Sequence, residues 1–281
     1  MVIEHIPLED ELGDVLEKAM RHAHLNEHEL ANKADVAREK IRDAVDYRYD
    51  LTVEELHRLS NALRLNEVGL AALAQGRYPL PQISGLSFCL YPLRTPHGIG
   101  VANAYVVADC SLSSGLLFDC GSDAALLRRV WPKNIKRLDA IFITHSETEH
   151  VGGLRGLLSE FGSVPVFAPE GAALEGALSI GEGARLTFGG FEVKTLRTPG
   201  HVEAHNCYVV TSPRLPTAAP LVVSGDMLFA GSVGAPYFCR DRSAESLQRL
   251  FVQLPETTVV APGHGPLTTI QNERRYNPFV T

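Results

Sequence analysis

The second part of this 281-residue chain contains short apolar runs that each end abruptly in a polar residue. The terminating residues are Asp119, His145, His201, Asp226 and His264. Helical patterns at 123–131, 152–162 and 243–254 lie between some of the runs, which predicts a layered protein of strands and helices. Because loops at one edge of such sheets gather functional groups, we expect these five side chains to be informative about function.

The chain changes character near residue 76. Upstream, apolar residues recur at helical spacing in five stretches, at 11–25, 27–34, 36–45, 52–65 and 66–75. Asn26, and Thr52 with Glu55 three residues later, provide helix start signals. Downstream, β-rich runs occur at 87–93, 103–108, 115–121, 140–145, 164–169, 185–198, 206–212, 220–226 and 257–265. We therefore predict an α+β protein with a helical domain at 1–76, a Gly/Pro-rich linker at 77–85 and a strand-rich domain at 86–281.

The segment "HSETEH" offers four potential metal donors within six positions, namely His145, Glu147, Glu149 and His150. Residues i and i+2 of an extended stretch point the same way, so His145 and Glu147 can serve one ion. If a helix begins near Glu149, that residue and His150 can face a neighbouring ion. A metal needs three or four converging donors, and the distant candidates are His201, Asp226 and His264.

These segments carry a family resemblance. Thr144-His145-x-Glu147-x-Glu149-His150, Thr198-Pro199-Gly200-His201, Gly225-Asp226 and Pro262-Gly263-His264-Gly265 resemble the motif series of the metallo-β-lactamase fold superfamily. The resemblance implies an αβ/βα sandwich with two divalent metal ions at one edge. It implies a first site of His145, Glu147 and His201, a second of Glu149, His150 and His264, and Asp226 as the bridge. Asp119 matches a buried acid that orients the metal loop.

The segments 225–238 and 268–279 resemble the glyoxalase II-like and persulfide dioxygenase-like branch. Two departures stand against a glutathione thioester as substrate. Ala235 occupies a position where that branch is expected to have arginine, and no C-terminal helical domain that would hold glutathione is recognised. We expect specificity for a small-molecule substrate to lie in the loops at 95–101 and 232–241.

The leading interpretation is a metal-dependent hydrolase that uses a metal-activated water, with Glu149 and Asp226 in catalytic roles. His205, four residues after His201, either orients substrate and donates a proton or supports a ligand from behind. Glu147 is a harder donor than imidazole, which favours iron or manganese without excluding zinc. A glutamate in place of histidine at position 147 also resembles the flavodiiron proteins, so a non-haem di-iron redox or oxygen-handling enzyme is the second interpretation. A transcriptional regulator with a metal- or ligand-sensing domain is the third.

The N-terminal helices resemble the Cro/phage-repressor helix-turn-helix. The resemblance places a recognition helix near Ala37 with Arg38, Lys40 and Arg42 as DNA-binding residues. Residues 1–79, however, contain ten Lys/Arg and sixteen Asp/Glu, a balance of −6, whereas DNA-binding surfaces are normally basic. A dimerisation or partner-docking role is at least as compatible with this charge, and a homodimer is expected.

Composition also predicts the surroundings of the protein. No apolar run approaches the roughly 20 residues needed to cross a membrane, and the acidic N-terminus does not resemble a signal peptide. Five cysteines without a CxxC pair are typical of reduced thiols. We therefore expect a cytoplasmic protein that does not bind membranes.

Overall fold

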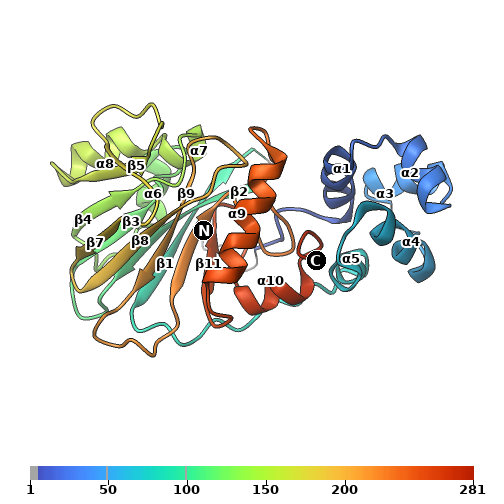
Figure 1. Ribbon diagram of the computed structural model, residues 1–281. Coiled ribbons are helices and arrows are strands. Elements are labelled where there is room, and N and C mark those ends of the chain that lie inside the picture. The colour runs from blue at the N-terminus through green and yellow to red at the C-terminus, as the bar shows by residue number, and fades with distance from the viewer. Residues whose placement is uncertain (1–5, 49, 99) are drawn as a thin grey trace.

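The structure is a computed structural model that describes residues 6–48, 50–98 and 100–281 (Figure 1). Its N-terminal part contains α1 (Leu12–Ala23), α2 (Glu27–Ala34), α3 (Arg38–Val45), α4 (Val53–Leu63) and α5 (Glu67–Ala74), which confirms the five predicted helices. The start signals also act as predicted. Asn26 accepts the backbone amides of His28 and Glu29, and Thr52 accepts that of Glu55. The helices share one apolar core of their own.

The remaining residues form two six-stranded sheets. The first has the order β1 (Cys89–His97), β2 (Gly100–Ala108), β3 (Ser114–Phe118), β4 (Arg137–Phe142), β5 (Val166–Pro169) and β6 (Leu178–Ile180). The second has the order β12 (Thr268–Thr269), β11 (Val259–Pro262), β10 (Leu221–Gly225), β9 (Asn206–Thr211), β8 (Phe191–Arg197) and β7 (Arg185–Phe188). The helices are α6 (Ala124–Val130), α7 (Thr148–Val151), α8 (Leu154–Phe161), α9 (Arg240–Gln253) and α10 (Ile270–Tyr276).

Three apolar layers hold this second part together. The central layer fills the space between the sheets and includes Phe118, Phe142 and Tyr208. An outer layer packs α6 and α8 against the first sheet, and another packs α9 and α10 against the second. The arrangement is helix, sheet, sheet, helix, as Figure 1 shows, so the predicted two-sheet mixed fold is confirmed.

The polar residues that end the apolar runs follow strands of both sheets. Asp119 follows β3, His145 follows β4 and Asp226 follows β10. His201 and His264 lie beyond the ends of β8 and β11. Because β3 and β4 are parallel, as are β10 and β11, each pair delivers its following loops to the same edge. The topology therefore brings residues from 119 to 264 to one place.

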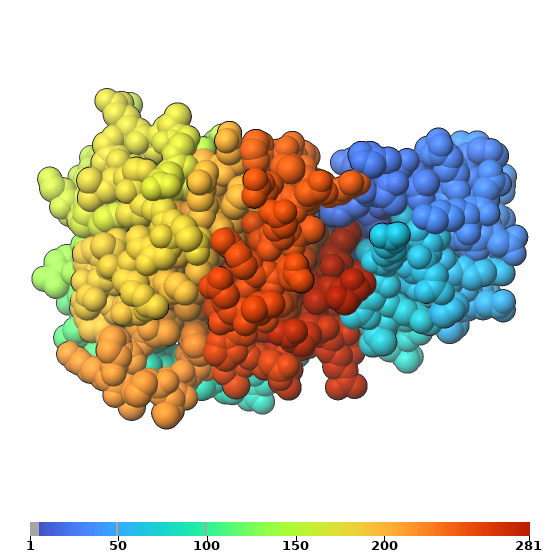
Figure 2. All heavy atoms as spheres, viewed as in Figure 1, coloured from blue at the N-terminus to red at the C-terminus, as the bar shows by residue number. Residues whose placement is uncertain are grey.

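The two parts of the chain are in direct contact along α1, α5 and the C-terminal segment (Figures 1 and 2). The backbone amide of Asn66 donates to Pro278, and its side-chain amide donates to Arg275 and Val280. The predicted linker is also anchored, since the Tyr78 hydroxyl donates to Glu273 at 2.7 Å. These contacts make a continuous structure out of the helical and strand-rich parts.

The prediction of reduced thiols is wrong for two cysteines. Cys89 and Cys110 form a disulfide, because antiparallel pairing of β1 with β2 brings the start of one strand beside the end of the other. Cys120, Cys207 and Cys239 are free thiols. Disulfides are rare in a reducing cytoplasm, so this bond removes the thiol argument for the cytoplasmic location, which stays a prediction. Among the described residues, no helix has the length and apolar character needed to span a membrane.

Candidate metal centre

Seven of the predicted ligands converge at the common edge of the sheets. Donor atoms of His145, Glu147, His201 and Asp226 all lie within 4.8 Å of one another. Donor atoms of Glu149, His150 and His264 form a second such group. The division into two groups matches the two sites that the sequence resemblance implied. That these groups bind metal ions stays a prediction.

The four candidate ligand histidines each make a hydrogen-bonding contact through the Nδ1 atom of the ring, which leaves the Nε2 atom available to bind a metal ion. His145 Nδ1 lies 3.0 Å from Thr144 Oγ1, and His150 Nδ1 lies 3.0 Å from Asp119 Oδ2. His201 Nδ1 lies 2.7 Å from the Ala235 carbonyl oxygen, and His264 Nδ1 lies 3.0 Å from that of Val101. The Nε2 atoms of His145, His150 and His201 are buried and lack a hydrogen-bond partner. A buried polar atom without a hydrogen-bond partner lowers the stability of the folded state. In metal sites, a ligand histidine is typically oriented by a hydrogen bond from the ring nitrogen that does not bind the metal. The donor set therefore fits metal ions.

Asp226 lies between the two groups. Its Oδ1 is 3.5 Å from His150 Nε2, and its Oδ2 is 3.8 Å from His201 Nε2 and 3.4 Å from His264 Nε2. The side chain is almost fully buried, and its Oδ1 has no hydrogen-bond partner. A carboxylate that reaches donors of both groups is positioned as a bridge would be.

Two carboxylates at this edge, Glu147 and Asp226, favour the ionised form. The imidazoles of His145 and His201, 3.7 and 3.4 Å from Glu147, lower the pKa of that carboxyl well below its ordinary value. Burial raises the pKa of Asp226, but the neighbouring His150 and His264 outweigh burial and lower it. Both groups are therefore negatively charged at neutral pH, which is the form that binds a cation.

Asp119 fixes the loop that carries the first ligands. Its Oδ1 accepts the backbone amide of Thr144 at 2.8 Å, while Oδ2 accepts the Thr144 hydroxyl at 2.8 Å and lies 3.0 Å from His150 Nδ1. The residue is 1% exposed and adopts a left-handed backbone with φ of 58°, which is unusual outside glycine. These contacts are those expected of an acid that orients the metal loop.

His205 lies behind the first group and does not belong to it. Its side chain is fully buried, its ring centroid is 5.2 Å from that of His145, and its Nδ1 is 2.8 Å from the Thr198 hydroxyl oxygen. Burial, together with neighbouring His145 and His201, lowers its pKa well below the ordinary value. Of the two predicted roles, this place fits support of a ligand better than contact with substrate.

Close backbone packing leaves no room for side chains at two glycines. A Cβ atom on Gly263 would come within 2.1 Å of Asp226 Oδ1, and one on Gly234 within 1.8 Å of the Asp226 carbonyl oxygen. Glycine at positions 234 and 263 therefore allows the backbone there to pack directly against Asp226.

Residues that sequence reasoning did not select border the centre. His97 Nε2 lies 3.4 Å from Glu149 Oε1, and the Tyr237 ring centroid lies 5.3 Å from that of His201. Both belong to the loops in which specificity was expected. Glu9, with Oε2 3.8 Å from His264 Nδ1, comes from the N-terminal segment, and nothing in the sequence around it indicated this contact.

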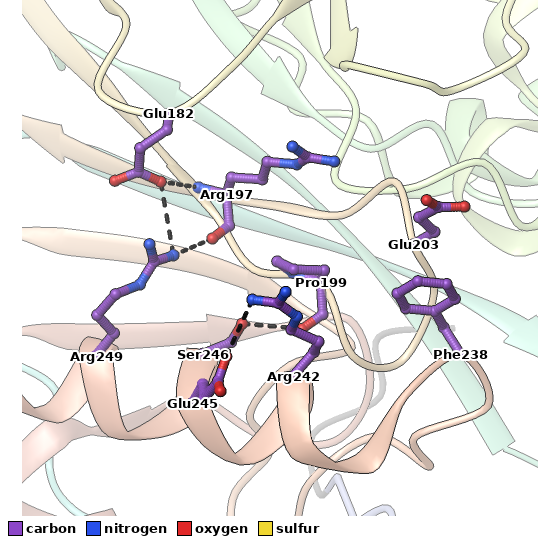
Figure 3. Close-up of a pocket in the computed structure, with 9 residues that line it drawn as sticks. All are labelled: Glu182, Arg197, Pro199, Glu203, Phe238, Arg242, Glu245, Ser246 and Arg249. Carbon is purple, nitrogen blue, oxygen red and sulfur yellow. Dashed lines mark hydrogen bonds and ion pairs between the residues drawn. The ribbon is translucent and has the colours of Figure 1, made fainter.

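A separate hollow of about 400 Å³ lies where α9 meets the segment before His201 (Figure 3). Its charged side chains are largely paired: Arg249 lies 3.6 Å from Glu182, and Arg242 lies 3.3 Å from Glu245. The Ser246 hydroxyl donates to Pro199 O at 2.9 Å. These contacts anchor the approach to His201 on α9.

The predicted DNA-binding residues lie on α3, and acids of the same domain pair with all three. Arg38 and Arg42 lie 3.2 and 3.4 Å from Glu27, and Lys40 lies 3.1 Å from Glu55. These pairs partly neutralise the basic groups that a phosphate backbone would contact. The helix-turn-helix assignment and DNA binding stay predictions.

Three comparisons with known proteins bear on the strand-rich part. The chain is 30% identical over 213 residues to "Probable metallo-hydrolase YqgX" of Bacillus subtilis (strain 168), covering 66% of this chain and 96% of that one. It is 29% identical over 153 residues to a hydroxyacylglutathione hydrolase of Klebsiella pneumoniae, covering 53% of this chain and 56% of that one. It is similar to the crystal structure of TTHA1623 in a di-iron-bound form, with TM-score 0.51, 28% identity and coverage of 66% and 98%.

The family itself is matched over more than half of the chain. Residues 97–264 match the Metallo-beta-lactamase superfamily, and this range contains every candidate ligand from His145 to His264. The two-sheet fold, the order of the motifs and this match agree, and the chain belongs to the metallo-beta-lactamase superfamily.

Proposed function

We propose that this protein is a metal-dependent hydrolase with a binuclear centre. One ion would be held by His145, Glu147 and His201, the other by Glu149, His150 and His264, with Asp226 shared between them. The observation that carries the proposal is the set of buried imidazole nitrogens that lack a partner and converge with three carboxylates. The relative named as a probable metallo-hydrolase supports the same reaction class.

Different residues of the chain have different roles in the proposed reaction. When bound, two divalent ions supply an activated water and polarise the bond to be cleaved. Asp119 and the carbonyls of Ala235 and Val101 fix the imidazoles so that the ligand geometry exists beforehand. Glu149, 15% exposed and 3.4 Å from His97, is proposed to exchange a proton with the reacting groups at the mouth of the centre. Tyr237, 73% exposed, is available for contact with substrate.

We propose iron or manganese in preference to zinc. Glu147 replaces an imidazole by an oxygen donor, and hard oxygen donors shift preference toward these metals. The similar structure solved in a di-iron-bound form supports this choice. The same observation favours the second candidate function, a di-iron redox or oxygen-handling enzyme.

The substrate proposed is a small ester or thioester other than a glutathione thioester. Ala235 stands where an arginine is expected for the glyoxalase II-like branch. The helical domain is proposed as a docking or dimerisation module, with DNA binding as its alternative, because α3 pairs its basic groups internally.

The test uses full-length protein stripped of metal and then reloaded with iron(II), manganese(II) or zinc(II). A panel of small esters and thioesters, including a glutathione thioester, is assayed with each form. We expect hydrolysis of a panel member that a chelator abolishes and reloading restores. If no loaded form hydrolyses any member, while the iron form consumes oxygen with an added electron donor, the redox alternative replaces the hydrolase.

A further inference from the structure

Contacts from the helical part reach the loop at 231–239, which connects Asp226 to α9. Asp10, just before α1, accepts a hydrogen bond from the Ser232 hydroxyl and forms an ion pair with Lys18. Lys18, on α1, also donates to the carbonyl oxygen of Val233 at 3.0 Å. At the far end of the loop, Arg240 donates to the carbonyl oxygen of His22 on α1.

Burial makes this contact different from a surface ion pair. Ser232 is fully buried, Asp10 is 6% exposed, and the Lys18 side chain is 17% exposed. Exposed pairs are weak because water and salt screen them, whereas a charge pair excluded from water persists only with its hydrogen bonds complete. Asp10 and Lys18 therefore form a fixed attachment between α1 and the loop.

The other face of the same loop packs on candidate ligands. The carbonyl oxygen of Ala235 accepts from His201 Nδ1 at 2.7 Å. A Cβ atom on Gly234 would lie 3.2 Å from the same Nδ1 atom and 1.8 Å from the Asp226 carbonyl oxygen, so the loop backbone is in immediate contact with both residues. One residue, Gly234, separates Val233, which Lys18 holds, from Ala235, which holds His201.

The strand-rich domain anchors both ends of this loop. At its far end the backbone amides of Phe238 and Cys239 donate to the carbonyl oxygens of His201 and Gly200 at 3.0 and 3.1 Å. Two further hydrogen bonds hold its beginning. Glu273 accepts the backbone amide of Gly231 at 2.9 Å, and the Asn277 side-chain amide donates to Ser232 O at 2.9 Å. The hydrogen bond that reaches Val233 comes from Lys18. The Lys18 ammonium also lies 5.6 Å from the centre of the Phe229 ring, which in turn is 5.7 Å from the His264 ring.

We propose that Asp10 and Lys18 are positioning residues for His201. They hold Val233, and thereby the Ala235 carbonyl, where it orients the His201 imidazole. The helical domain is then a structural part of the metal centre, and a partner that displaces α1 will lower the affinity of the first site. This inference rests on the proposed metal binding and adds a means of regulating it.

The test is a cobalt(II) titration of chelator-treated full-length protein, followed by visible absorption. The Asp10→Asn/Lys18→Met double variant removes both charges together, so no unpaired charge stays buried. We expect affinity for one of two cobalt ions to fall about tenfold, as for loss of a residue that supports a ligand, with a changed absorption band for that ion. Lys33→Met, an exposed lysine of α2, is the matched control and should leave both ions unchanged. Lys18→Arg should restore much of the affinity.

The outcomes separate this inference from the metal proposal. Wild-type protein that binds no cobalt overturns the metal centre and this role with it. Wild-type protein that binds two ions, and a folded double variant that binds both with unchanged affinity and spectrum, overturns only the positioning role. If the double variant does not fold by circular dichroism, Ser232→Ala removes a single hydroxyl from the same contact. Because Ser232→Ala leaves the Lys18–Val233 hydrogen bond in place, Lys18→Gln is titrated beside it, and unchanged titrations of both folded variants also overturn the role.

Discussion

Helix α3 and the metal centre both concentrate ionisable side chains, but they satisfy them in opposite ways. On α3, Arg38, Lys40 and Arg42 each find an acid within the helical domain. In the centre, His145 Nε2, His201 Nε2 and Asp226 Oδ1 are buried without a hydrogen-bond partner. Buried polar atoms normally have partners, so the second pattern fits a site that binds a cation and the first does not. Of the two regions, the centre has the stronger structural argument for a bound ligand.

Loss of the central carboxylate should have the largest effect on this contrast. Asp226→Ala removes the group that reaches donors of both sites, so at least one metal ion should be lost. Affinity should fall by more than the roughly 100-fold upper end seen for residues that merely support a ligand. Metal-to-protein ratios measured by mass spectrometry check this. Asp46→Ala, about half exposed on the helical domain, is the control, and an unchanged ratio in Asp226→Ala refutes the ligand assignment.

A smaller effect is expected from exchanging the unusual donor. Glu147→His restores an imidazole, so protein equilibrated with equal iron(II) and zinc(II) should shift its occupancy toward zinc. The total number of bound ions should stay the same. The exposed Glu245→His provides the matched control. Identical metal ratios in wild type and Glu147→His would show that this residue does not select the metal.

The paired charges of α3 should matter little. Replacing Arg38, Lys40 and Arg42 by alanine removes partly exposed ion pairs, and pairs near the surface contribute about 0–1 kcal/mol each to the free energy of unfolding. Metal content should not change, and binding to duplex DNA should be absent before and after the change. A salt-dependent duplex affinity in wild type that the triple variant loses would instead support the regulator interpretation.

A separate effect, on stability and not on metal binding, concerns pH at the contact between the two parts. Burial, with nearby Arg240 and Lys18, lowers the pKa of His22 to about 4, below its ordinary 6.5. Between these values the unfolded chain binds a proton that the folded chain does not, so stability falls as pH drops from 6.5 to 4. His22→Leu should lessen this loss, measured as the difference in thermal midpoint between pH 7 and pH 5. The exposed His28→Leu should not, and equal losses in both variants would argue against the assignment.

Much of the candidate site could be predicted because its donors lie close together at 145–150 or directly after recognisable strands. His145 and Glu147 alternate along an extended segment, Glu149 and His150 lie in the short helix α7, and the distant partners each follow a strand. The Cys89–Cys110 bond could not be predicted in this way, because it depends on the register of β1 with β2.

Other features depend on contacts that sequence patterns do not encode. Glu9 and Asp10 precede the first helix, and no periodicity there indicates their contacts with His264 and Ser232. The strands β6 and β12 are three and two residues long, too short for an alternating pattern. The Lys18–Val233 and Ser232–Asp10 contacts join residues 215 and 222 positions apart, so no local pattern indicates them.

The most direct measurement is the metal content of full-length protein after equilibration with iron(II), manganese(II) and zinc(II) and removal of free ions. Two ions per chain are predicted, because two donor groups share Asp226. A chain that retains no ion under any of the three conditions would contradict the central claim, since its unpaired imidazoles would then have no ligand to explain them.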